Sequence, residues 1–168
     1  LADSLPEKKA ARWAELAERV RESFLKYFPL KDEGFLSDCL HCKPGTPASK
    51  AEPDDHLRPN QLLAITLGLV EDKKLRRIIL LNTSELLVPG GIRSLADRPV
   101  KYPLPVYGAD GRLLNDPNHP YQGHYRGDED TCRKVAYHNG TAWTWQMPLF
   151  PEAYYITHGA FGRATAIS

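Results

Sequence analysis

Apolar residues recur at helical intervals near the start of the chain. Ser4 and Glu7 have the spacing of a capping box, a pattern that satisfies free N–H groups where a helix begins. After it, apolar side chains follow one another every three or four positions, namely Trp13, Leu16, Ala17, Val20, Phe24, Tyr27 and Phe28. This periodicity predicts an amphipathic helix that ends before Pro29.

Two further helical patterns differ in how much of their circumference is apolar. The stretch LRPNQLLAITLGLV (57–70) has Pro59 where the first helical turn tolerates proline, and it is apolar nearly all round. It predicts a helix that is buried on most sides. The stretch EDKKLRRIILLNTSELLV (71–88) begins with acidic residues and carries one apolar stripe, so it predicts an outer amphipathic helix that ends at Pro89.

A fourth helix, apolar on most faces, is predicted from about residue 141 to 157, and FGRATAIS (161–168) hints at a fifth. GFLSDCL (34–40) is interpreted as a short extended piece. Outer amphipathic helices therefore alternate with inner apolar ones, as in layers of helical hairpins. We expect residues 1–168 to form a single all-α domain, which agrees with the chain length.

A segment of unusual length separates the third and fourth predicted helices. Residues 89–140 are rich in turn-forming residues, and connections of this length are commonly functional. A disordered insertion is the alternative, although the Tyr and Leu content of the segment argues against it. We expect a long irregular loop between an outer and an inner helix.

Charge and composition narrow the class of partner. The formal net charge is +1 with histidine neutral, so the sequence predicts no basic surface for nucleic acid. No stretch approaches the roughly 20 apolar residues of a membrane span, and the first residues lack the apolar centre of a signal peptide. We expect a soluble, cytoplasmic protein that binds neither nucleic acid nor membrane.

The cysteines are few and odd in number, which fits a reducing compartment better than a disulfide framework. CLHC (39–42) has the spacing of zinc and redox sites. A closed zinc site needs four ligands, and only Cys132 and scattered histidines remain to complete one. We expect neither a metal nor an organic cofactor, and a zinc site is the alternative.

Four segments carry a family resemblance: HLRPNQLLAITL (56–67), LLVPGGIRSL (86–95), PYQGHYRGDEDTCRKVAYHNGTAWTW (120–145) and FPEAYY (150–155). In this order they resemble the C-terminal glucosidase domain of glycogen debranching enzymes, the amylo-α-1,6-glucosidases. The resemblance spans about residues 34–157. The pairing of RPNQ with YH-x-G-x-x-W is its most specific part.

The resemblance implies a fold and a function. Members of the family fold this domain as a toroid of six α-hairpins with the active site in a funnel, so the chain is expected to be part of such an (α/α) toroid, from its C-terminal half. The implied activity is general acid/base hydrolysis, with inversion, of α-1,6 branch points in glycogen or another branched α-glucan. The rest of the parent toroid, or a second copy of the chain, is expected to cover apolar helix surface.

The carboxyl groups that such hydrolysis requires are scarce near the matched motifs. Inverting glycosidases use two of them, about 6.5 to 9.5 Å apart. The local acidic cluster is GDED, with Asp128, Glu129 and Asp130 as candidate catalytic residues. The alternative is a polar loop that caps a helix or binds a hydroxyl. The resemblance places the acid before the matched region and the base after Ser168, so we do not expect the isolated chain to cleave glycans.

Residues suited to sugar binding lie at the starts of two predicted inner helices. Sugar rings stack on aromatic planes and hydrogen-bond to planar polar groups. The predicted substrate-binding residues are Arg58, Asn60, Gln61, Tyr137, His138, Asn139 and Trp143. Parallel inner helices would open both sets onto one pocket. Tyr125 and Arg126 are further candidates, whereas Trp145 is expected to point into helix packing.

Structural roles are the alternative for several of these residues. Arg58 and Asn60 suit a buried bridge that ties two loops together, and His138 suits a core histidine bonded to a backbone carbonyl. For the whole chain, a glycoside hydrolase is the first hypothesis. A non-catalytic glucan-binding module and a helical scaffold without a ligand are the other two.

Overall fold

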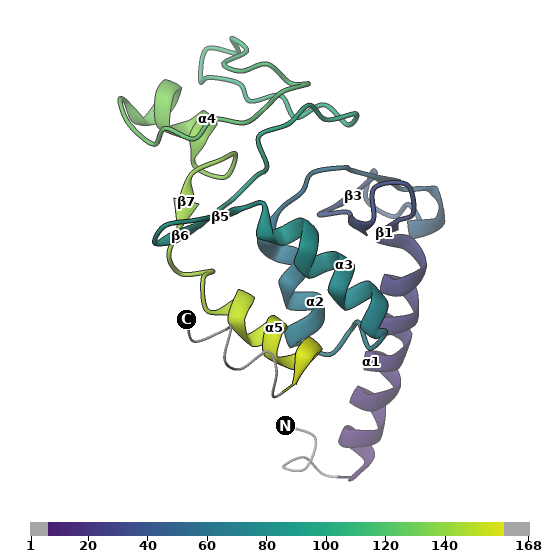
Figure 1. Cartoon of the computed structure of the whole chain (residues 1–168). Coiled ribbons are helices and arrows are strands. Elements are labelled where there is room, and N and C mark those ends of the chain that lie inside the picture. The colour runs from purple at the N-terminus through teal and green to yellow at the C-terminus, as the bar shows by residue number, and fades with distance from the viewer. Residues whose placement is uncertain (1–6, 160–168) are drawn as a thin grey trace.

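The computed structural model describes residues 7–159 and combines helices with three small antiparallel sheets (Figure 1). The helices are α1 (Glu7–Tyr27), α2 (Leu62–Thr66), α3 (Lys73–Ser84), α4 (Lys134–Ala136) and α5 (Leu149–His158), with 3₁₀ turns η2 (Ala48–Lys50) and η3 (Pro59–Gln61) and a π-helical turn η4 (Glu129–Arg133). The strands are β1 (Pro29–Leu30), β2 (Phe35–Leu36), β3 (Leu40–His41), β4 (Glu52–Pro53), β5 (Leu87–Val88), β6 (Gly91–Arg93) and β7 (Ala142–Trp143). The predicted cap at Ser4 and the suggested fifth helix lie outside the described residues.

The expected all-α toroid is wrong for this chain, because strands replace helix at several places. They pair as β1–β2, β3–β4 and β5–β6–β7. The predicted fourth helix begins as β7, in which Ala142 pairs with Arg93 of β6, and helical geometry starts only in α5. Pairing with β6 gives this backbone the hydrogen-bond partners that a helix would otherwise supply. Gly91 permits the close approach, since a Cβ there would lie 3.2 Å from the Cβ of Ala142.

Helix α1 confirms the first predicted helix. It ends at Tyr27, and Pro29, which has no N–H to donate, begins β1. The rings of Phe24 and Phe28 stack with centroids 4.6 Å apart, and Phe24 packs against the core. By contrast, every residue from 11 to 20 is exposed. Only the C-terminal part of α1 is therefore anchored to the rest of the described chain.

The helix predicted to start at Pro59 is present but short. Arg58 is extended, as residues before proline usually are, and the turn η3 leads into α2. Gly68 has a φ of +76°, which ends the helical run. The N–H of Val70 then donates to the carbonyl of Ala64 at 2.9 Å, so one of the free carbonyls at the helix end is satisfied.

Helix α3 begins with a side-chain cap and ends before its predicted limit. Asp72 accepts a hydrogen bond from the N–H of Leu75 at 2.6 Å. The prediction extended this helix to Val88, but the helix ends at Ser84 and the chain then forms β5. Strand β5 pairs with β6 across a tight turn in which Gly90 has a φ of +78°.

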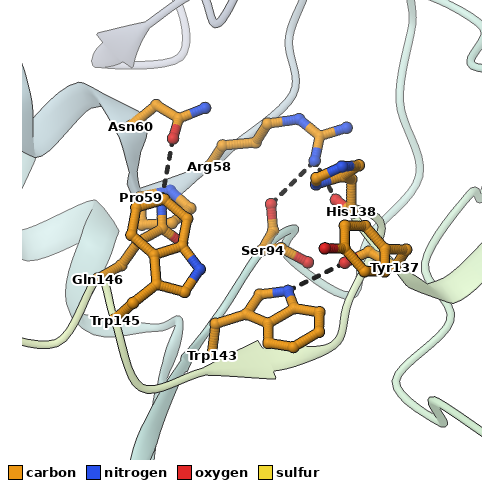
Figure 2. Close-up of a pocket in the computed structure, with 9 residues that line it drawn as sticks. All are labelled: Arg58, Pro59, Asn60, Ser94, Tyr137, His138, Trp143, Trp145 and Gln146. Carbon is orange, nitrogen blue, oxygen red and sulfur yellow. Dashed lines mark hydrogen bonds between the residues drawn. The ribbon is translucent and has the colours of Figure 1, made fainter.

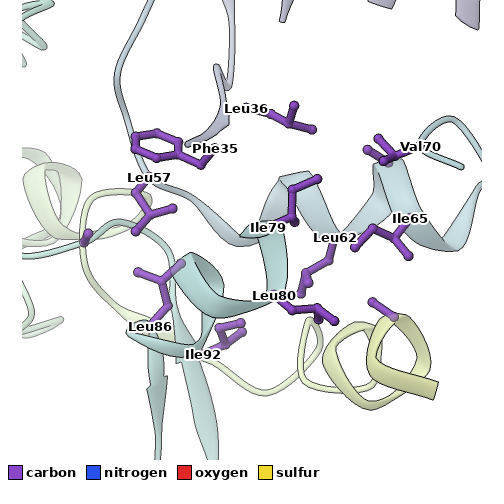
Figure 3. Close-up of a cluster of buried hydrophobic side chains, with 13 residues drawn as sticks. Phe35, Leu36, Leu57, Leu62, Ile65, Val70, Ile79, Leu80, Leu86 and Ile92 are labelled. Carbon is purple, nitrogen blue, oxygen red and sulfur yellow. The ribbon is translucent and has the colours of Figure 1, made fainter. Parts of the chain in front are cut away.

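The hydrophobic core lies between α2, α3 and α5 (Figure 3). Its buried members are Phe35, Leu36, Leu57, Leu62, Ala64, Ile65, Val70, Ile79, Leu80, Leu86, Ile92, Ala96 and Ala153. Burying each large side chain of this kind stabilises a fold by roughly 1.5–3 kcal/mol. No helix in the described residues combines the length and the apolar character needed to cross a membrane.

The long segment between β6 and η4 is irregular, as predicted, and hydrogen bonds join residues within it. The N–H of Val100 donates to the carbonyl of Asn118, and that of Leu104 donates to the carbonyl of Pro117, both at 2.8 Å. Asn115 adds a side-chain bond, from Nδ2 to the carbonyl of Leu104 at 2.9 Å. These contacts argue against the disordered alternative.

Candidate functional site

Segments far apart in the sequence meet at a cavity of about 470 Å³ (Figure 2). It lies between η3, the chain after β6, the turn after α4, and the connection from β7 to α5. Its lining residues are Arg58, Pro59, Asn60, Ser94, Tyr137, His138, Trp143, Trp145 and Gln146. A cavity of this size, lined by rings and a few polar groups, is typical of small-molecule sites.

Arg58 ties several parts of the cavity wall together (Figure 2). Its Nη1 donates to the carbonyl oxygen of Ser94 at 2.9 Å and also to that of His138. Its Nη2 donates to Asn139 Oδ1 at 3.1 Å, and Nε lies 3.4 Å from Asp38 Oδ2. Burial lowers the pKa of Arg58 and the carboxylate of Asp38 opposes that shift, so the guanidinium stays charged at neutral pH. These contacts agree with the predicted structural bridge.

Asn60 is held at both ends of its amide group. Its Nδ2 donates to Asp38 Oδ1 at 2.8 Å, and its Oδ1 accepts from Gln146 Nε2 at 3.0 Å. Asp38 therefore supports both Asn60 and Arg58 from outside the cavity. Such a network fixes the orientation of the polar groups in the wall before any ligand arrives.

A tight turn brings Tyr137 and His138 to the cavity. Helix α4 ends at Ala136, Tyr137 keeps helical backbone angles, and the chain then turns through residues 138–140. Asn139 is buried and holds the turn, because its Nδ2 donates to the carbonyl of Val135 at 3.1 Å. Since its Oδ1 also accepts from Arg58, Asn139 links the turn to the opposite wall.

Gly140 completes this turn in a conformation that suits only glycine. Its φ is +142°, and its N–H donates to Ser94 Oγ at 2.9 Å. A Cβ at this position would lie 2.7 Å from the backbone carbonyl of Gln122. The absence of a side chain therefore allows two backbone segments to meet beside the cavity.

Aromatic rings gather beside the turn. Trp143 Nε1 donates to the carbonyl of Tyr137 at 3.0 Å, and the two ring centroids lie 5.1 Å apart. Tyr125 lies 5.5 Å from the ring of Trp143 and 5.6 Å from that of Tyr137, edge-on in both cases. The ring of His138 packs edge-on against Tyr137 at 4.4 Å. Edge-on packing of this kind restrains the indole of Trp143.

Trp145 lines the cavity, and its expected position in the helix packing is wrong. Its side chain is 67% exposed. The expectation assumed a helix through this region, whereas Ala142 and Trp143 form strand β7, so helical periodicity does not decide where Trp145 points. Its neighbour Gln146 is buried instead and bonds Asn60.

The structure brings most of the predicted binding residues together. Those that line the cavity are Arg58, Asn60, Tyr137, His138 and Trp143. Asn139 lies behind the wall, and Gln61 is buried against β2, where its Oε1 accepts from the N–H of Leu36 at 3.3 Å. Sequence reasoning missed Ser94 and Gln146. Gln146 could have been predicted from the sequence, because it is an amide directly before an apolar stretch. Ser94 could not, because its contact with Arg58 is made by its backbone carbonyl, which every residue has.

The acidic candidates do not line this cavity. Asp128 caps the turn η4, since its carboxylate accepts from the N–H of Asp130 at 2.8 Å and from the hydroxyl of Thr131. Glu129 pairs with Arg133 at 3.0 Å. These contacts match the capping interpretation of the cluster. Among the described residues that line the cavity, there is neither an aspartate nor a glutamate.

A buried carboxylate stabilises the segment behind the cavity. Asp54 is 1% exposed, and its Oδ1 accepts from Ser37 Oγ at 3.0 Å and from the N–H of Asp38 at 2.8 Å. Its Oδ2 lies 3.0 Å from His41 Nε2 and 3.2 Å from His56 Nδ1. Asp54 therefore fixes the backbone of Asp38, the residue that holds two side chains of the cavity wall.

The ionisation of Asp54 and His56 follows from these contacts. Burial alone would raise the pKa of Asp54, but hydrogen bonds from His56 and His41 hold it well below its ordinary value. Burial would likewise lower the pKa of His56, yet Asp54 and the carbonyl of Tyr102, which lies 2.9 Å from His56 Nε2, raise it. Nε2 of His56 faces a carbonyl oxygen and Nδ1 faces the carboxylate of Asp54, and both of these groups accept hydrogen bonds. Because both ring nitrogens carry a proton only in the imidazolium, the geometry favours that form of His56.

The CLHC segment meets no further ligands in the described part of the chain. Cys39 and Cys42 are exposed, and no three His, Cys, Asp or Glu residues among positions 7–159 are grouped as a metal ion requires. Burial, together with the nearby carboxylates of Asp54 and Asp38, raises the pKa of Cys39. A raised pKa lowers the thiolate fraction, which disfavours redox chemistry at this thiol.

Clustered aromatic rings, hydrogen-bonded amides and a partly buried guanidinium meet at this cavity, and groups of these kinds can stack on a ring and bond planar polar groups. The comparison with protein families identifies the family of the chain. The chain belongs to the amylo-alpha-1,6-glucosidase family, whose model matches residues 1–116 and 111–166, so the family resemblance is confirmed. This family is associated with the glycoside hydrolases of glycogen debranching. No curated protein and no solved structure matches the chain.

Proposed function

We propose that the cavity binds a terminal glucose unit of glycogen or another branched α-glucan. The observation that carries this proposal is the meeting of the RPN and YH-x-G-x-x-W segments, about 80 positions apart, on one cavity. These are the segments on which the family resemblance rests. Their convergence in space supports a common ligand.

The chemistry of the wall suits a pyranose ring. The C–H faces of the sugar would stack on Trp143 and Trp145, while its hydroxyls would bond the amide of Asn60 and the imidazole of His138. Asn60 is fixed by its own hydrogen bonds, so little side-chain entropy is lost on binding. Arg58 makes three hydrogen bonds within the protein, so in this proposal it acts by holding the two walls at a fixed separation.

We further propose that the chain contributes this binding cavity to a glycoside hydrolase that releases α-1,6-linked glucose with inversion. Such hydrolysis needs a carboxylic acid and a carboxylate on opposite sides of the scissile bond. The described lining supplies neither, so the proposed acid and base come from residues outside it. The lack of a carboxyl group in the lining also favours a second candidate, a glucan-binding module without catalysis.

Calorimetric titration of the chain with isomaltose and with maltose tests the binding proposal. We expect Trp145→Ala to weaken binding by about tenfold, which corresponds to about 1.4 kcal/mol. Trp13→Ala is the matched control, because Trp13 is 58% exposed on α1 and does not line the cavity. Equal affinities for the two variants, or no binding by the unaltered chain, would contradict the proposal.

Hydrolysis is tested separately, through the glucose released from a phosphorylase limit dextrin. Glucose release by a polypeptide that contains this chain, with loss of release in Trp143→Ala, supports the hydrolase. Binding without release from any such polypeptide supports the binding module instead. Release by the 168-residue chain alone would mean that the acid and base lie within it, and would contradict the expectation that the isolated chain does not cleave glycans.

A further inference from the structure

The N-terminal half of α1 presents an apolar stripe that no described residue covers. Trp13, Leu16 and Val20 are exposed large apolar side chains, and all positions from 11 to 20 are exposed. At 3.6 residues per turn these three side chains share a face with Phe24, which packs against the core. Figure 1 shows this half of α1 extending past the other helices.

The stripe leads into a small cavity between α1 and α2. Its volume is about 120 Å³, and its apolar wall includes Phe24, Phe28, Leu63 and Leu69. Gln61 also lines it, and this side chain is 7% exposed. Its Nε2 is buried without an acceptor among the described residues. An unsatisfied buried donor is costly, so a segment that brought an oxygen atom here would gain a hydrogen bond.

Basic side chains without an ion pair among the described residues flank one edge of the stripe, whereas Arg21 at the other edge pairs with Glu18. Arg12, Arg19 and Lys26 recur every seven residues, so they lie along one edge, beside Leu16. All three are exposed, and no ion pair within the described residues engages either arginine. Three glutamates of α1 lie on the face opposite the stripe: Glu15, Glu18 and Glu22. A partner seated on the stripe therefore meets positive charge at this edge.

We propose that the stripe of α1 and the adjoining cavity dock an amphipathic helical segment of polypeptide that carries Asp or Glu along one edge of its apolar face. Apolar side chains of the partner cover Trp13, Leu16 and Val20. Its acidic edge pairs with Arg12 and Arg19, and a carbonyl or side-chain oxygen accepts from Gln61 Nε2. This inference does not depend on the sugar-binding proposal, because none of the side chains proposed to contact the partner lines the proposed sugar-binding cavity, although Asn60 borders both cavities.

The same charges disfavour two other occupants. In an antiparallel pair of α1 helices the basic edge of one copy would face the basic edge of the other, and in a parallel pair it would face Ala10 and Ala17. A second copy therefore supplies no carboxylate. An anionic membrane surface would attract the basic edge but repel the glutamates on the polar face, which interfacial helices usually replace with lysine and arginine.

The test uses the full chain and two synthetic helical peptides of about 20 residues. They share one leucine stripe and differ only at its edge, which is glutamate in one and lysine in the other. We expect fluorescence anisotropy to show at least about tenfold tighter binding of the glutamate peptide, weakened by salt. The double variant Arg12→Glu with Arg19→Glu is expected to reverse that preference.

Variants of the stripe and of the opposite face separate docking from other effects. Trp13→Ser with Val20→Ser is expected to abolish binding of the glutamate peptide without loss of helical circular dichroism, because both side chains are exposed. Glu15→Gln, on the opposite face, is the matched control and is expected to bind as the unaltered chain does. Equal binding of the two peptides, or binding that survives the stripe variant, would overturn the proposal.

Two further measurements exclude the alternative occupants. Light scattering of the free chain reports dimers, and co-sedimentation with vesicles of phosphatidylserine and phosphatidylcholine reports membrane binding. A dimer or a vesicle complex that forms with the unaltered chain and is lost in the stripe variant would overturn the proposed occupant. A monomer that ignores vesicles and binds the glutamate peptide supports it.

Discussion

Gly140 lies between the chain that carries Ser94 and the backbone of Gln122, at a φ of +142°. We expect Gly140→Ala to lower the free energy of unfolding by about 3 kcal/mol, because the methyl group would strain the backbone and clash with the Gln122 carbonyl. Urea denaturation at constant temperature measures the loss.

Gly45→Ala is the control for this prediction. Gly45 also has a positive φ, of +82°, but a Cβ there would meet nothing within 4 Å. We expect it to cost only about 1 kcal/mol, the conformational penalty alone. If the two variants lost equal stability, the proposed clash at Gly140 would play no part.

Residue identity predicted which types of side chain the site would use, but not always where they would point. The sequence predicts Arg58, Asn60 and Trp143 as binding residues, and all three line the cavity. The sequence predicts that Trp145 packs inside, whereas Trp145 lies at the cavity. Its direction depends on strand β7, which forms only through pairing with β6. Local sequence does not encode that pairing.

At the scale of elements, α3 offers a test of local capping. The carboxylate of Asp72 accepts from the N–H of Leu75 at 2.6 Å. We expect Asp72→Ala to reduce the free energy of unfolding by about 1 kcal/mol, since it leaves a helical N–H without a partner. Asp72→Asn keeps an acceptor oxygen, so we expect it to reduce the free energy of unfolding by only about 0.3 kcal/mol. A loss as large in the asparagine variant would contradict the capping role.

Helical periodicity was most informative where an element is long. It predicted α1 and the start of α3, because many turns repeat the same apolar spacing. It failed at β5 and β7, each only two residues long. Strands this short carry no periodic signal, and their existence depends on hydrogen-bond partners from another part of the chain.

For the whole molecule, the buried pair of Asp54 and His56 predicts how stability depends on pH. The folded-state pKa of His56 is raised above 6.5, so its contribution is complete below that pH and is lost as the pH rises through the raised value. The pKa of Asp54 is lowered from 3.8, so its contribution is present above 3.8 and is lost as the pH falls. We expect the pair to stabilise the fold fully between pH 3.8 and pH 6.5.

Urea denaturation across this range and up to pH 9 checks the prediction. His56→Gln is expected to be less stable at pH 5 by roughly 3 kcal/mol, because it leaves a buried carboxylate without its charged partner. It should also show a smaller loss of stability above pH 6.5. His119→Gln, at an exposed ion pair with Asp97, is the control and should keep the original profile. An unchanged slope in His56→Gln would rule out this histidine as the source.

Four features could be predicted from the amino-acid sequence: the family, the long amphipathic α1, the irregular segment after β6 and most residue types of the candidate cavity. Each of these depends on local spacing or on motifs that the chain displays directly. The folded chain was needed to reveal the three sheets, the exposure of Trp145, the bridge made by Arg58 and the pairing of Asp54 with two histidines. Those features depend on contacts between residues far apart in the chain, and such contacts exist only once the backbone has folded.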